Sequence, residues 1–366
     1  MAPIKVGLIG YGLSTNVFHL PWILPNEDLQ VYAFLQRAEA PKGTIEPGKH
    51  CTVDYPQARH YRTGDEFFAD AETDLVIVCT KQDTHFYFAE LALKAGKHVV
   101  VEKPFTITSA EADKLIALSK QTGKVLTCYQ NRRYDSDFRT LQALIQQGSF
   151  GKITEFTGHY DVDNPPWIHQ DKPAEAGDGL LYVLGSHSID QTIQLFGLPK
   201  TIFCVKRSIL VSNGADDTFT ILLQYAGDQR DLLVTIKTSV VNPMPSHKIP
   251  KFSIRGTHGT YFKTGEDPQI EQLLGLGMKP GKDESFGEEP EKYHGYLTTR
   301  KDDGSKFDGV VKSRKGSYVD CYKDIVKAIR GEQDLVVKAE ESRNVIRLIE
   351  LANESAEKGV LVEWRD

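Results

Sequence analysis

The chain lacks the features that mark several special classes of protein. No apolar run in its 366 residues approaches the roughly 18 that a membrane-spanning helix needs. The N-terminal residues 1–5 lead directly into an apolar segment, so we expect no signal peptide and a cytosolic protein. The formal net charge of −6, with acids and bases interspersed, argues against nucleic acid or a membrane as the partner. We find no internal repeat and no low-complexity tract.

Cysteine is scarce, and no metal-ligand spacing is present. The five cysteines are scattered and form no Cys-x-x-Cys pair, which predicts buried, reduced thiols rather than a disulfide framework. No cluster of histidine, cysteine and acidic residues has the spacing of a metal site, so we predict no metal. The cysteines are Cys51, Cys79, Cys128, Cys204 and Cys321.

The chain is longer than one ordinary domain, and its first third alternates strands with helices. This alternation predicts a doubly wound parallel sheet with right-handed crossovers. Residues 37–57, which are polar and rich in Gly and Pro, are expected to form a loop. The expected strands are 4–9, 29–35, 75–79, 98–101 and 125–129, and the expected helices are 13–24, 84–95 and 109–121, the last capped at Ser109.

Beyond about residue 150, strands follow one another with few helices between them, which predicts a large, mostly antiparallel open sheet. We therefore expect a dinucleotide-binding domain over 1–130 and a substrate-binding and oligomerisation domain over 131–366, whose last helices are candidates to pack back on the first domain. Residues 264–316 are expected to form a surface excursion. The expected strands are 153–160, 201–210, 219–225, 232–239, 252–255, 260–263 and 360–364, and the helices 187–195, 318–329 and 339–357.

A glycine turn after the first strand is a near match to the dinucleotide fingerprint Gly-x-Gly-x-x-Gly. Gly10 would allow the tight turn, Gly12 would let the backbone approach a pyrophosphate, and the following helix would offer its N–H groups to the phosphates. The third position is Thr15, so either the helix stands slightly off or the hydroxyl joins the phosphate contacts. The motif predicts a bound dinucleotide.

The end of the second strand distinguishes the two nicotinamide dinucleotides. An NAD site usually has an acidic residue there to bind the ribose 2′-hydroxyl, whereas this strand ends in Gln36 and Arg37. A guanidinium pairs well with a 2′-phosphate, so we favour NADP(H) over NAD(H). NAD(H) remains an alternative cofactor, because the acidic residue Glu39 lies nearby and because Arg37 can instead be a solvated loop cation.

The motif Glu102-Lys103-Pro104 follows an apolar strand, at the carboxyl end where doubly wound sheets bind ligands. With this motif, the chain resembles the Gfo/Idh/MocA oxidoreductases nearly end to end, and most closely the branch with NADP-dependent scyllo-inositol dehydrogenases. The other shared motifs are Gly10-Tyr11-Gly12-Leu13, Val17-Phe18-His19-Leu20-Pro21, Thr84-His85, Asn131-Arg132-Arg133-Tyr134-Asp135-Ser136-Asp137-Phe138, Gly185-Ser186-His187-Ser188-Ile189-Asp190-Gln191 and Gly256-Thr257-His258-Gly259-Thr260.

The resemblance implies a Rossmann domain followed by an α/β domain whose open sheet face often packs against another subunit, so a homodimer or homotetramer is expected. It also implies a set of cofactor-binding residues, in which Gln82 can present an amide near the nicotinamide. The set is Gly10, Gly12, Leu13, Ser14, Thr15, Gln36, Arg37, Thr80, Gln82, His85, Glu102 and Lys103.

The resemblance implies catalysis by Lys103 and His187. Imidazole is a base of suitable pKa for an alcohol, and a neighbouring ammonium favours the developing alkoxide. Val183 departs from the family, which usually has an aspartate there to orient the histidine. Three interpretations are open: Asp178 or Asp161 takes over, the two residues act alone on a more activated carbonyl or imine, or the protein binds cofactor without turnover.

The expected substrate pocket combines arginine, carboxylate and aromatic groups, which suits a sugar or cyclitol. One of Arg132 and Arg133 is expected only to pair with Asp135 or Asp137. Relatives tend to have a further arginine beside the tryptophan, whereas this chain has Trp167-Ile168-His169. The pocket chemistry can therefore differ from that for scyllo-inositol. The expected substrate-binding residues are Lys103, Arg132, Tyr134, Asp161, Trp167 and His187.

Together these features predict an NADP(H)-dependent oxidoreductase that transfers hydride to or from a secondary alcohol or carbonyl of a sugar, cyclitol or related small molecule. One alternative is a non-catalytic nucleotide-binding sensor or regulator of the same fold, which Val183 favours. The other is a redox-cycling enzyme that keeps its cofactor tightly bound through a net-neutral reaction.

Overall fold

The computed structural model describes residues 1–300 and 303–366, and these divide into two compact units. Each unit collects segments that are distant in sequence, so neither is one continuous stretch of chain. The first unit contains residues 1–131, 270–286 and 317–343. The second contains residues 132–269, 287–316 and 344–366.

The first unit is built on a six-stranded parallel sheet in the order β3-β2-β1-β4-β5-β6. Its central strands are continuous apolar runs, because both faces of a parallel sheet are covered. All four residues of β4, Leu-Val-Ile-Val, are buried. The strands are β1 (Ile4–Ile9), β2 (Leu29–Leu35), β3 (Arg59–Tyr61), β4 (Leu75–Val78), β5 (His98–Val101) and β6 (Leu126–Cys128).

Among the helices of the first unit, α2, α3 and α5 begin with a side-chain cap. In α5 the cap is Thr108 rather than the expected Ser109: its hydroxyl accepts from the Glu111 N–H, and the Glu111 carboxylate accepts from the Thr108 N–H. The helices are a π-helical turn (Ser14–His19), α1 (Leu20–Ile23), α2 (Cys51–Asp54), α3 (Gly64–Ala69), α4 (His85–Lys94), α5 (Ser109–Thr122), α9 (Gln269–Leu274) and α10 (Tyr318–Ile329).

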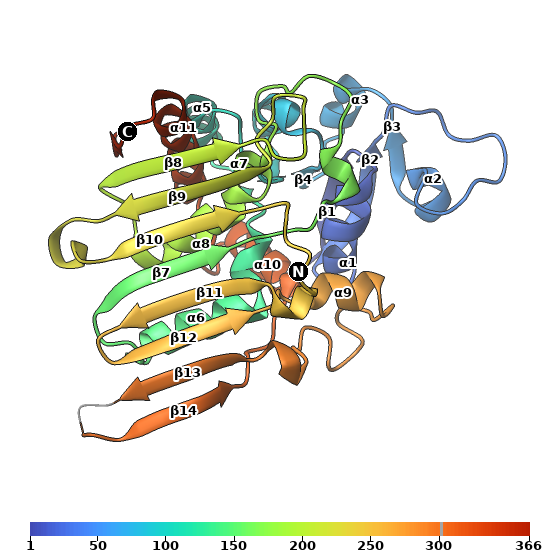
Figure 1. Cartoon of the computed structure of the whole chain (residues 1–366). Coiled ribbons are helices and arrows are strands. Elements are labelled where there is room, and N and C mark those ends of the chain that lie inside the picture. The colour runs from blue at the N-terminus through green and yellow to red at the C-terminus, as the bar shows by residue number, and fades with distance from the viewer. Residues whose placement is uncertain (301–302) are drawn as a thin grey trace. The chain divides into compact units, whose positions relative to one another are not determined.

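The second unit is built on a nine-stranded sheet in the order β14-β13-β12-β11-β7-β10-β9-β8-β15 (Figure 1). Only β7 and β10 pair in parallel, so the sheet is mostly antiparallel, and the expected fold class is confirmed. The strands are β7 (Ile153–His159), β8 (Thr201–Arg207), β9 (Thr218–Gln224), β10 (Leu233–Thr238), β11 (Pro250–Gly256), β12 (Gly259–Thr264), β13 (Gly295–Arg300), β14 (Lys306–Val311) and β15 (Val362–Glu363).

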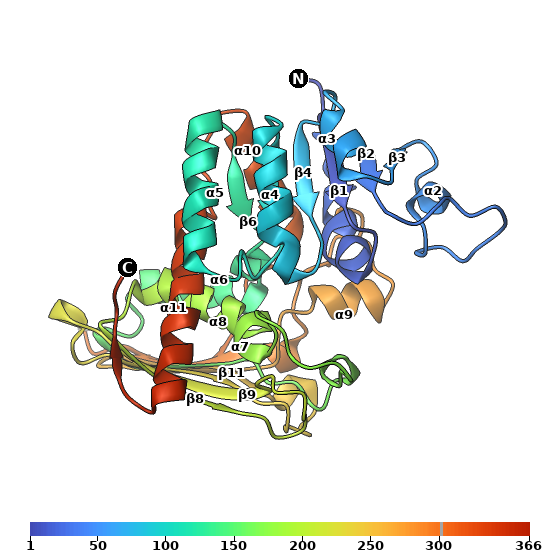
Figure 2. The same cartoon turned by 90° about the horizontal axis from the view of Figure 1, so that it is seen from above.

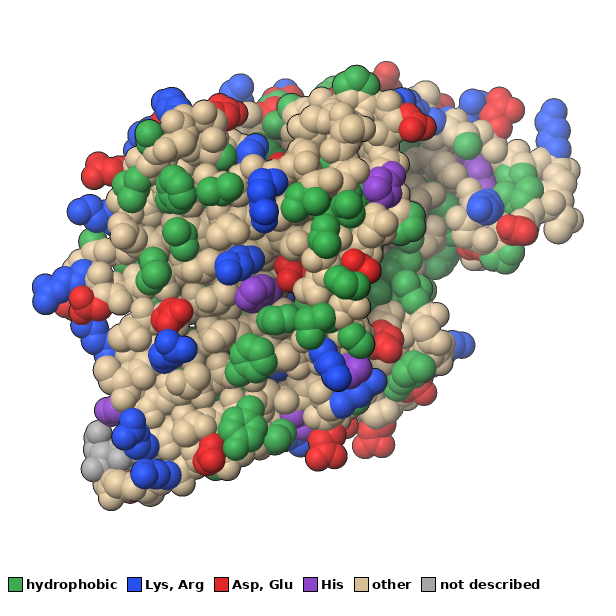
Figure 3. Space-filling view, in the orientation of Figure 1, with side chains coloured by type: hydrophobic (Ala, Val, Ile, Leu, Met, Phe, Trp, Pro, Cys, Tyr) green, Lys and Arg blue, Asp and Glu red, His purple; other side chains and the backbone are tan. Residues whose placement is uncertain are grey.

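Helices cover one face of this sheet, and among the described residues no α-helix covers the other (Figure 2). The covering helices are α6 (Ser136–Gln146), α7 (Leu180–Val183), α8 (Gly185–Phe196) and α11 (Ala339–Lys358). Figure 3 shows hydrophobic side chains spread among charged ones over the open face. The exposed hydrophobic residues on its strands include Val205, Leu233, Phe262, Tyr296 and Phe307.

The structure corrects the sequence interpretation at several places. Residues 264–316 are not only a surface excursion, since 295–300 and 306–311 form β13 and β14 at the edge of the sheet. The predicted loop 37–57 contains the short helix α2. The sequence analysis also missed β3, α3 and α6. β3 has only 3 residues and α3 only 6, too few to show a clear period. In contrast, α6 carries an amphipathic pattern, with Phe138, Leu141 and Leu144 buried at helical spacing.

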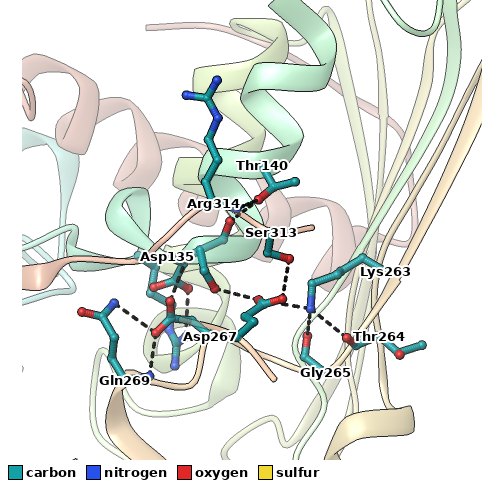
Figure 4. Close-up of polar contacts among 12 residues, drawn as sticks. Asp135, Thr140, Lys263, Thr264, Gly265, Asp267, Gln269, Ser313 and Arg314 are labelled. Carbon is teal, nitrogen blue, oxygen red and sulfur yellow. Dashed lines mark hydrogen bonds and ion pairs between the residues drawn. The ribbon is translucent and has the colours of Figure 1, made fainter. Parts of the chain in front are cut away.

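A buried polar cluster links β12, the start of α6 and residues 287–316 within the second unit (Figure 4). Lys263 Nζ lies 3.3 Å from Glu289 Oε1, and both side chains are fully buried. Glu289 also accepts hydrogen bonds from the hydroxyls of Ser136 and Ser313, at 2.7 and 2.5 Å. Because a buried charge is costly unless it is paired, this arrangement anchors the segment that carries β13 and β14.

No helix of the described residues is long and apolar enough to cross a membrane. The same part of the chain contains no group of three His, Cys, Asp or Glu side chains arranged to hold a metal ion.

The pH dependence of folding tests the buried cluster. Burial and the charge of Asp137 raise the pKa of Glu289 to about 7 against the opposing charge of Lys263. The folded state therefore disfavours the ionised carboxylate, and stability falls as the pH rises from the unfolded pKa of about 4.3 through 7. We expect Glu289→Gln to reduce this fall, as measured by urea unfolding between pH 4.5 and 8. An identical pH profile in the variant and the parent would contradict this assignment.

Candidate cofactor and substrate site

The glycine turn after β1 has the backbone geometry that its sequence requires. Gly10 has φ +96°, and a Cβ there would lie 2.7 Å from the carbonyl oxygen of Cys79, so only glycine fits. A Cβ on Gly12 would meet no atom within 4 Å, which leaves this side of the turn open. The Thr15 hydroxyl donates to the Gly10 carbonyl at 2.9 Å, so it stabilises the turn rather than pointing to a phosphate.

Glu102 connects the glycine turn with the end of β5. Its Oε1 accepts from the Ser14 hydroxyl at 2.6 Å and lies 3.1 Å from His19 Nε2. Its Oε2 accepts from the backbone N–H of Lys103 at 2.8 Å. The carboxylate therefore orients the backbone of Lys103, and the hydroxyl of Ser14 is turned toward Glu102.

The charge state of this junction follows from its contacts. Burial disfavours ionisation of Glu102, but the hydrogen bond and charge of His19, with the charge of Lys103, lower the pKa of Glu102 to about 2. Burial also opposes protonation of His19, yet Cys79 and Glu102 raise the pKa of His19 to about 10. The two shifts indicate a buried ion pair. Sequence analysis quoted His19 in a motif but missed this role, which only the fold reveals.

A cavity of about 630 Å³ opens beside the glycine turn, within the first unit. Gly10, Gln36, Arg37 and Thr80, all expected to bind the cofactor, contribute to its lining. The side chain of Gln36 is engaged with the protein, because its amide accepts from the Cys51 N–H at 3.0 Å and donates to the Lys49 carbonyl. The cavity has the place and size expected of a nucleotide site.

Two guanidinium groups line this cavity at the tips of β2 and β3. Arg37 is exposed, and Arg62 Nε donates to its backbone carbonyl at 3.2 Å. Arg62 also pairs with Glu39 at 2.9 Å, so the carboxylate that favoured NAD(H) has a cationic partner. Sequence analysis missed Arg62, because nothing in the sequence brings β3 beside Arg37.

The other expected cofactor residues of the first unit lie around the tips of β4 and β5. His85 is buried, with Nδ1 2.7 Å from the Pro104 carbonyl and Nε2 3.1 Å from the Thr80 carbonyl, so it joins these tips. Gln82 is half-buried in a 3₁₀ turn, Gln82–Thr84. Leu13 is 73% exposed at the start of the π-helical turn.

In the second unit, several chemical groups surround the ring of Tyr160, which follows β7. His187, the third residue of α8, is buried, and its ring centroid lies 6.0 Å from that of Tyr160. The Arg132 guanidinium donates to the Tyr160 hydroxyl and lies 4.5 Å from the ring centre. Arg132 also pairs with Asp135 at 3.1 Å, as the sequence suggested for one of the two arginines.

Arg133 and Asp161 make contacts within the protein. Arg133 forms a bidentate, buried ion pair with Asp190, at 2.7 and 2.6 Å, which fixes α8. Asp161 accepts from the Ser239 N–H at 2.9 Å and from the Asn242 side chain at 3.0 Å. Both oxygens of Asp161 therefore hold the segment after β10, which weakens the interpretation that Asp161 replaces the missing aspartate.

The remaining predicted substrate residues differ in accessibility. Trp167 is 49% exposed on a 3₁₀ turn, Pro166–Ile168, and can present its indole face to a ligand. His169 Nε2 lies 2.6 Å from the Asn164 side-chain oxygen. Tyr134 is buried against the Arg139 guanidinium, 5.9 Å from its ring centre. Val183, at the end of α7, has no group that could accept a hydrogen bond from an imidazole.

Comparisons with known proteins cover nearly the whole chain. The family models for the Gfo/Idh/MocA oxidoreductases match residues 4–130, as the NAD-binding Rossmann fold, and residues 142–364, as the C-terminal alpha/beta domain. The NADP(+) scyllo-inositol 2-dehydrogenase IolW of Bacillus subtilis is 35% identical over 97% of this chain and 94% of its own length. A crystal structure of an oxidoreductase from Bacillus cereus has 30% identity, covers 99% of both chains and superposes with a TM-score of 0.87.

The open side of Gly12 gives a test of the cofactor site that separates binding from folding. Gly12→Ala adds a methyl group that touches nothing in the protein, so we expect an unchanged melting temperature. The methyl group would obstruct a pyrophosphate, and NADPH should bind at least roughly tenfold more weakly, measured by fluorescence titration. Gly43→Ala, which also meets no atom, is the matched control. Parental NADPH affinity in Gly12→Ala would refute this position for the pyrophosphate.

Proposed function

Since the chain belongs to the Gfo/Idh/MocA oxidoreductase family, we propose that it is a cytosolic NADP(H)-dependent dehydrogenase or reductase of sugars, cyclitols or related small molecules. The observation that carries the proposal is the glycine turn beside a cavity lined by Arg37 and Arg62. The name of the relative IolW, which includes both NADP(+) and scyllo-inositol, adds support. In this proposal, residues 1–130 bind the dinucleotide and residues 131–366 bind the substrate.

The preference for NADP(H) rests on charge. A 2′-phosphate carries negative charge that two guanidinium groups can neutralise, and Glu39 is already paired with Arg62. Gly10, Gly12, Leu13, Ser14 and Thr15 would hold the pyrophosphate by their backbone. Thr80, Gln82, His85, Glu102 and Lys103 would shape the nicotinamide end, with Glu102 acting through the backbone of Lys103.

The bound dinucleotide would supply or accept the hydride, and the protein would move the proton. We assign Lys103 and His187 as the catalytic residues: His187 exchanges a proton with the reacting hydroxyl, and the Lys103 ammonium stabilises negative charge on that oxygen. Arg132 and Trp167 would bind the rest of a polyhydroxylated ring, with Tyr134 and Asp161 as the further substrate-binding residues of the proposal. Tyr160, packed between His187 and Arg132, supports the imidazole from one side.

The open face of the nine-stranded sheet is the proposed contact between subunits. It exposes Phe262, Tyr296 and Phe307, each more than two-fifths accessible, on neighbouring strands. Such apolar side chains gain free energy when a second copy covers them. We propose a homodimer or homotetramer formed through this face.

Val183 favours a second candidate, a nucleotide-binding sensor or regulator without turnover. Valine cannot orient an imidazole, and loss of an orienting carboxylate is costly to catalysis in other enzymes. The presence of both Lys103 and His187 favours the enzyme over the sensor, since a protein without chemistry has no need for this pair.

Cofactor preference is tested at Arg37. Arg37→Met removes charge-assisted hydrogen bonds to a phosphate, so NADPH affinity should fall roughly ten- to hundredfold while NADH affinity stays constant. Lys42→Met, an exposed cation on the same loop, is the control and should bind NADPH like the parent. Equal losses for NADPH and NADH in Arg37→Met would show that Arg37 does not read the 2′-phosphate.

Turnover separates the enzyme from the sensor. The parent, Lys103→Ala and Val183→Asp are assayed with NADP(H) against cyclitols, aldoses and keto-sugars in both directions. We expect the parent to be active and Lys103→Ala to lose at least roughly a hundredfold in rate. A parent that binds NADPH but stays inert, with activity only in Val183→Asp, would instead establish the sensor.

A further inference from the structure

Lys251 is a buried lysine whose ammonium lies against two aromatic rings. The residue is only 2% exposed. Its Nζ lies 4.5 Å from the ring centre of Tyr160 and 5.6 Å from that of Phe252. Among residues 1–300 and 303–366 it forms no hydrogen bond or ion pair. Burial of a cation without a directly bound counter-charge is costly, and the aromatic faces and the more distant charge of Asp135 offset only part of that cost.

A β-bulge turns Lys251 toward the helix-covered face of the sheet. On β12, Thr264 pairs with Pro250 and the next residue, Lys263, pairs with Phe252, which leaves Lys251 as the extra residue. Regular alternation from the buried Phe252 would place Lys251 on the open face, yet Lys251 is also buried. Bulges commonly redirect a side chain in this way beside active sites.

The bulge brings Lys251 to the same ring that His187 and Arg132 contact. The Tyr160 ring centre is 6.0 Å from that of His187, and 4.5 Å from both the Arg132 guanidinium and the Lys251 ammonium. All four residues belong to the second unit. A donor in this place would be within reach of a molecule bound against His187.

We infer that Lys251 donates a hydrogen bond to an oxygen of the substrate on which His187 acts. This inference rests on the proposed function, to which it adds a specificity-determining residue. A bound substrate oxygen would give the ammonium the hydrogen-bond acceptor that none of the described residues provides.

The surrounding charges favour an uncharged polyol as the ligand. Arg132 is already paired with Asp135, and Glu266 lies 3.6 Å from the same guanidinium. Burial raises the pKa of Asp135 well above its usual range, and the charges of Asp267 and Asp137 raise it further against those of Arg132 and Lys251. A carboxylate or phosphate on the substrate would meet these acidic groups, whereas a hydroxyl can accept from Lys251 without that repulsion.

The test compares Lys251→Met with Lys237→Met, which removes an exposed lysine from β10, a strand of the same sheet that pairs with β7. Methionine keeps the length and apolar stem of lysine but lacks the donor. Each protein, loaded with NADPH or NADP, is titrated by calorimetry with scyllo-inositol, myo-inositol, D-glucose and D-glucuronate, and is assayed for turnover. The melting temperature is measured beside these.

We expect Lys251→Met to weaken binding of the uncharged polyols, or raise their KM, roughly ten- to hundredfold. NADPH affinity should stay parental, and the melting temperature should stay equal or rise, because a buried cation has been removed. Lys237→Met should match the parent throughout. Parental polyol binding in Lys251→Met, or a melting temperature several degrees lower, would overturn the inference and make Lys251 structural.

The assay also separates this inference from the proposed function. Polyol binding that depends on Lys251 in a protein without turnover would support the lysine contact and refute the enzyme. Turnover that Lys251→Met does not change would support the enzyme and refute the contact. If the parent prefers D-glucuronate and Lys251→Met abolishes this preference, the proposal that the ligand is uncharged is overturned. If none of the probes binds, both proposals are overturned.

Discussion

One buried carboxylate, that of Glu102, joins the glycine turn of the candidate cofactor site to the end of β5. It binds the Ser14 hydroxyl and His19 on the segment after the glycine turn, and the backbone N–H of Lys103 at the end of β5. Because His19 and Lys103 keep Glu102 ionised at all ordinary pH values, the junction is a charged one in a buried place. Such a group is stable only while every partner stays in position, so it holds the glycine turn and the Lys103 backbone in a fixed relation.

In the second unit, an aromatic ring, that of Tyr160, contacts the groups of the candidate site, as the Glu102 carboxylate does in the first unit. Tyr160 packs against His187 and between the cationic groups of Arg132 and Lys251. The face of an aromatic ring, unlike a carboxylate, does not fix the tautomer of an imidazole that packs against it. It can restrict the orientation of the imidazole by contact.

Much of the fold could be predicted because its strongest signals are local. The apolar runs of β1, β4 and β5, the glycine turn, and the alternating strands β7 to β12 all appear in short windows of sequence. The elements that could not be predicted from the sequence have a common feature. In β13 an aromatic residue, Tyr296, is exposed while a polar one, Thr299, is buried, so hydrophobicity does not mark the buried face. The first turn of α6 holds an acidic residue, Asp137, that is buried only by tertiary contacts. Such positions do not reveal the buried face until the partners are known.

By itself, the sequence determined the apolar central strands of the first unit, the glycine turn and the cationic tip of β2, because each depends on neighbouring residues. It could not decide which charges neutralise one another. These pairings form only when distant segments of the chain meet in the folded structure. The ion pairs are Arg62 with Glu39, His19 with Glu102, and Arg133 with Asp190. The direction of Lys251 is likewise a tertiary property, since one extra residue in β11 reverses the face that alternation alone would assign.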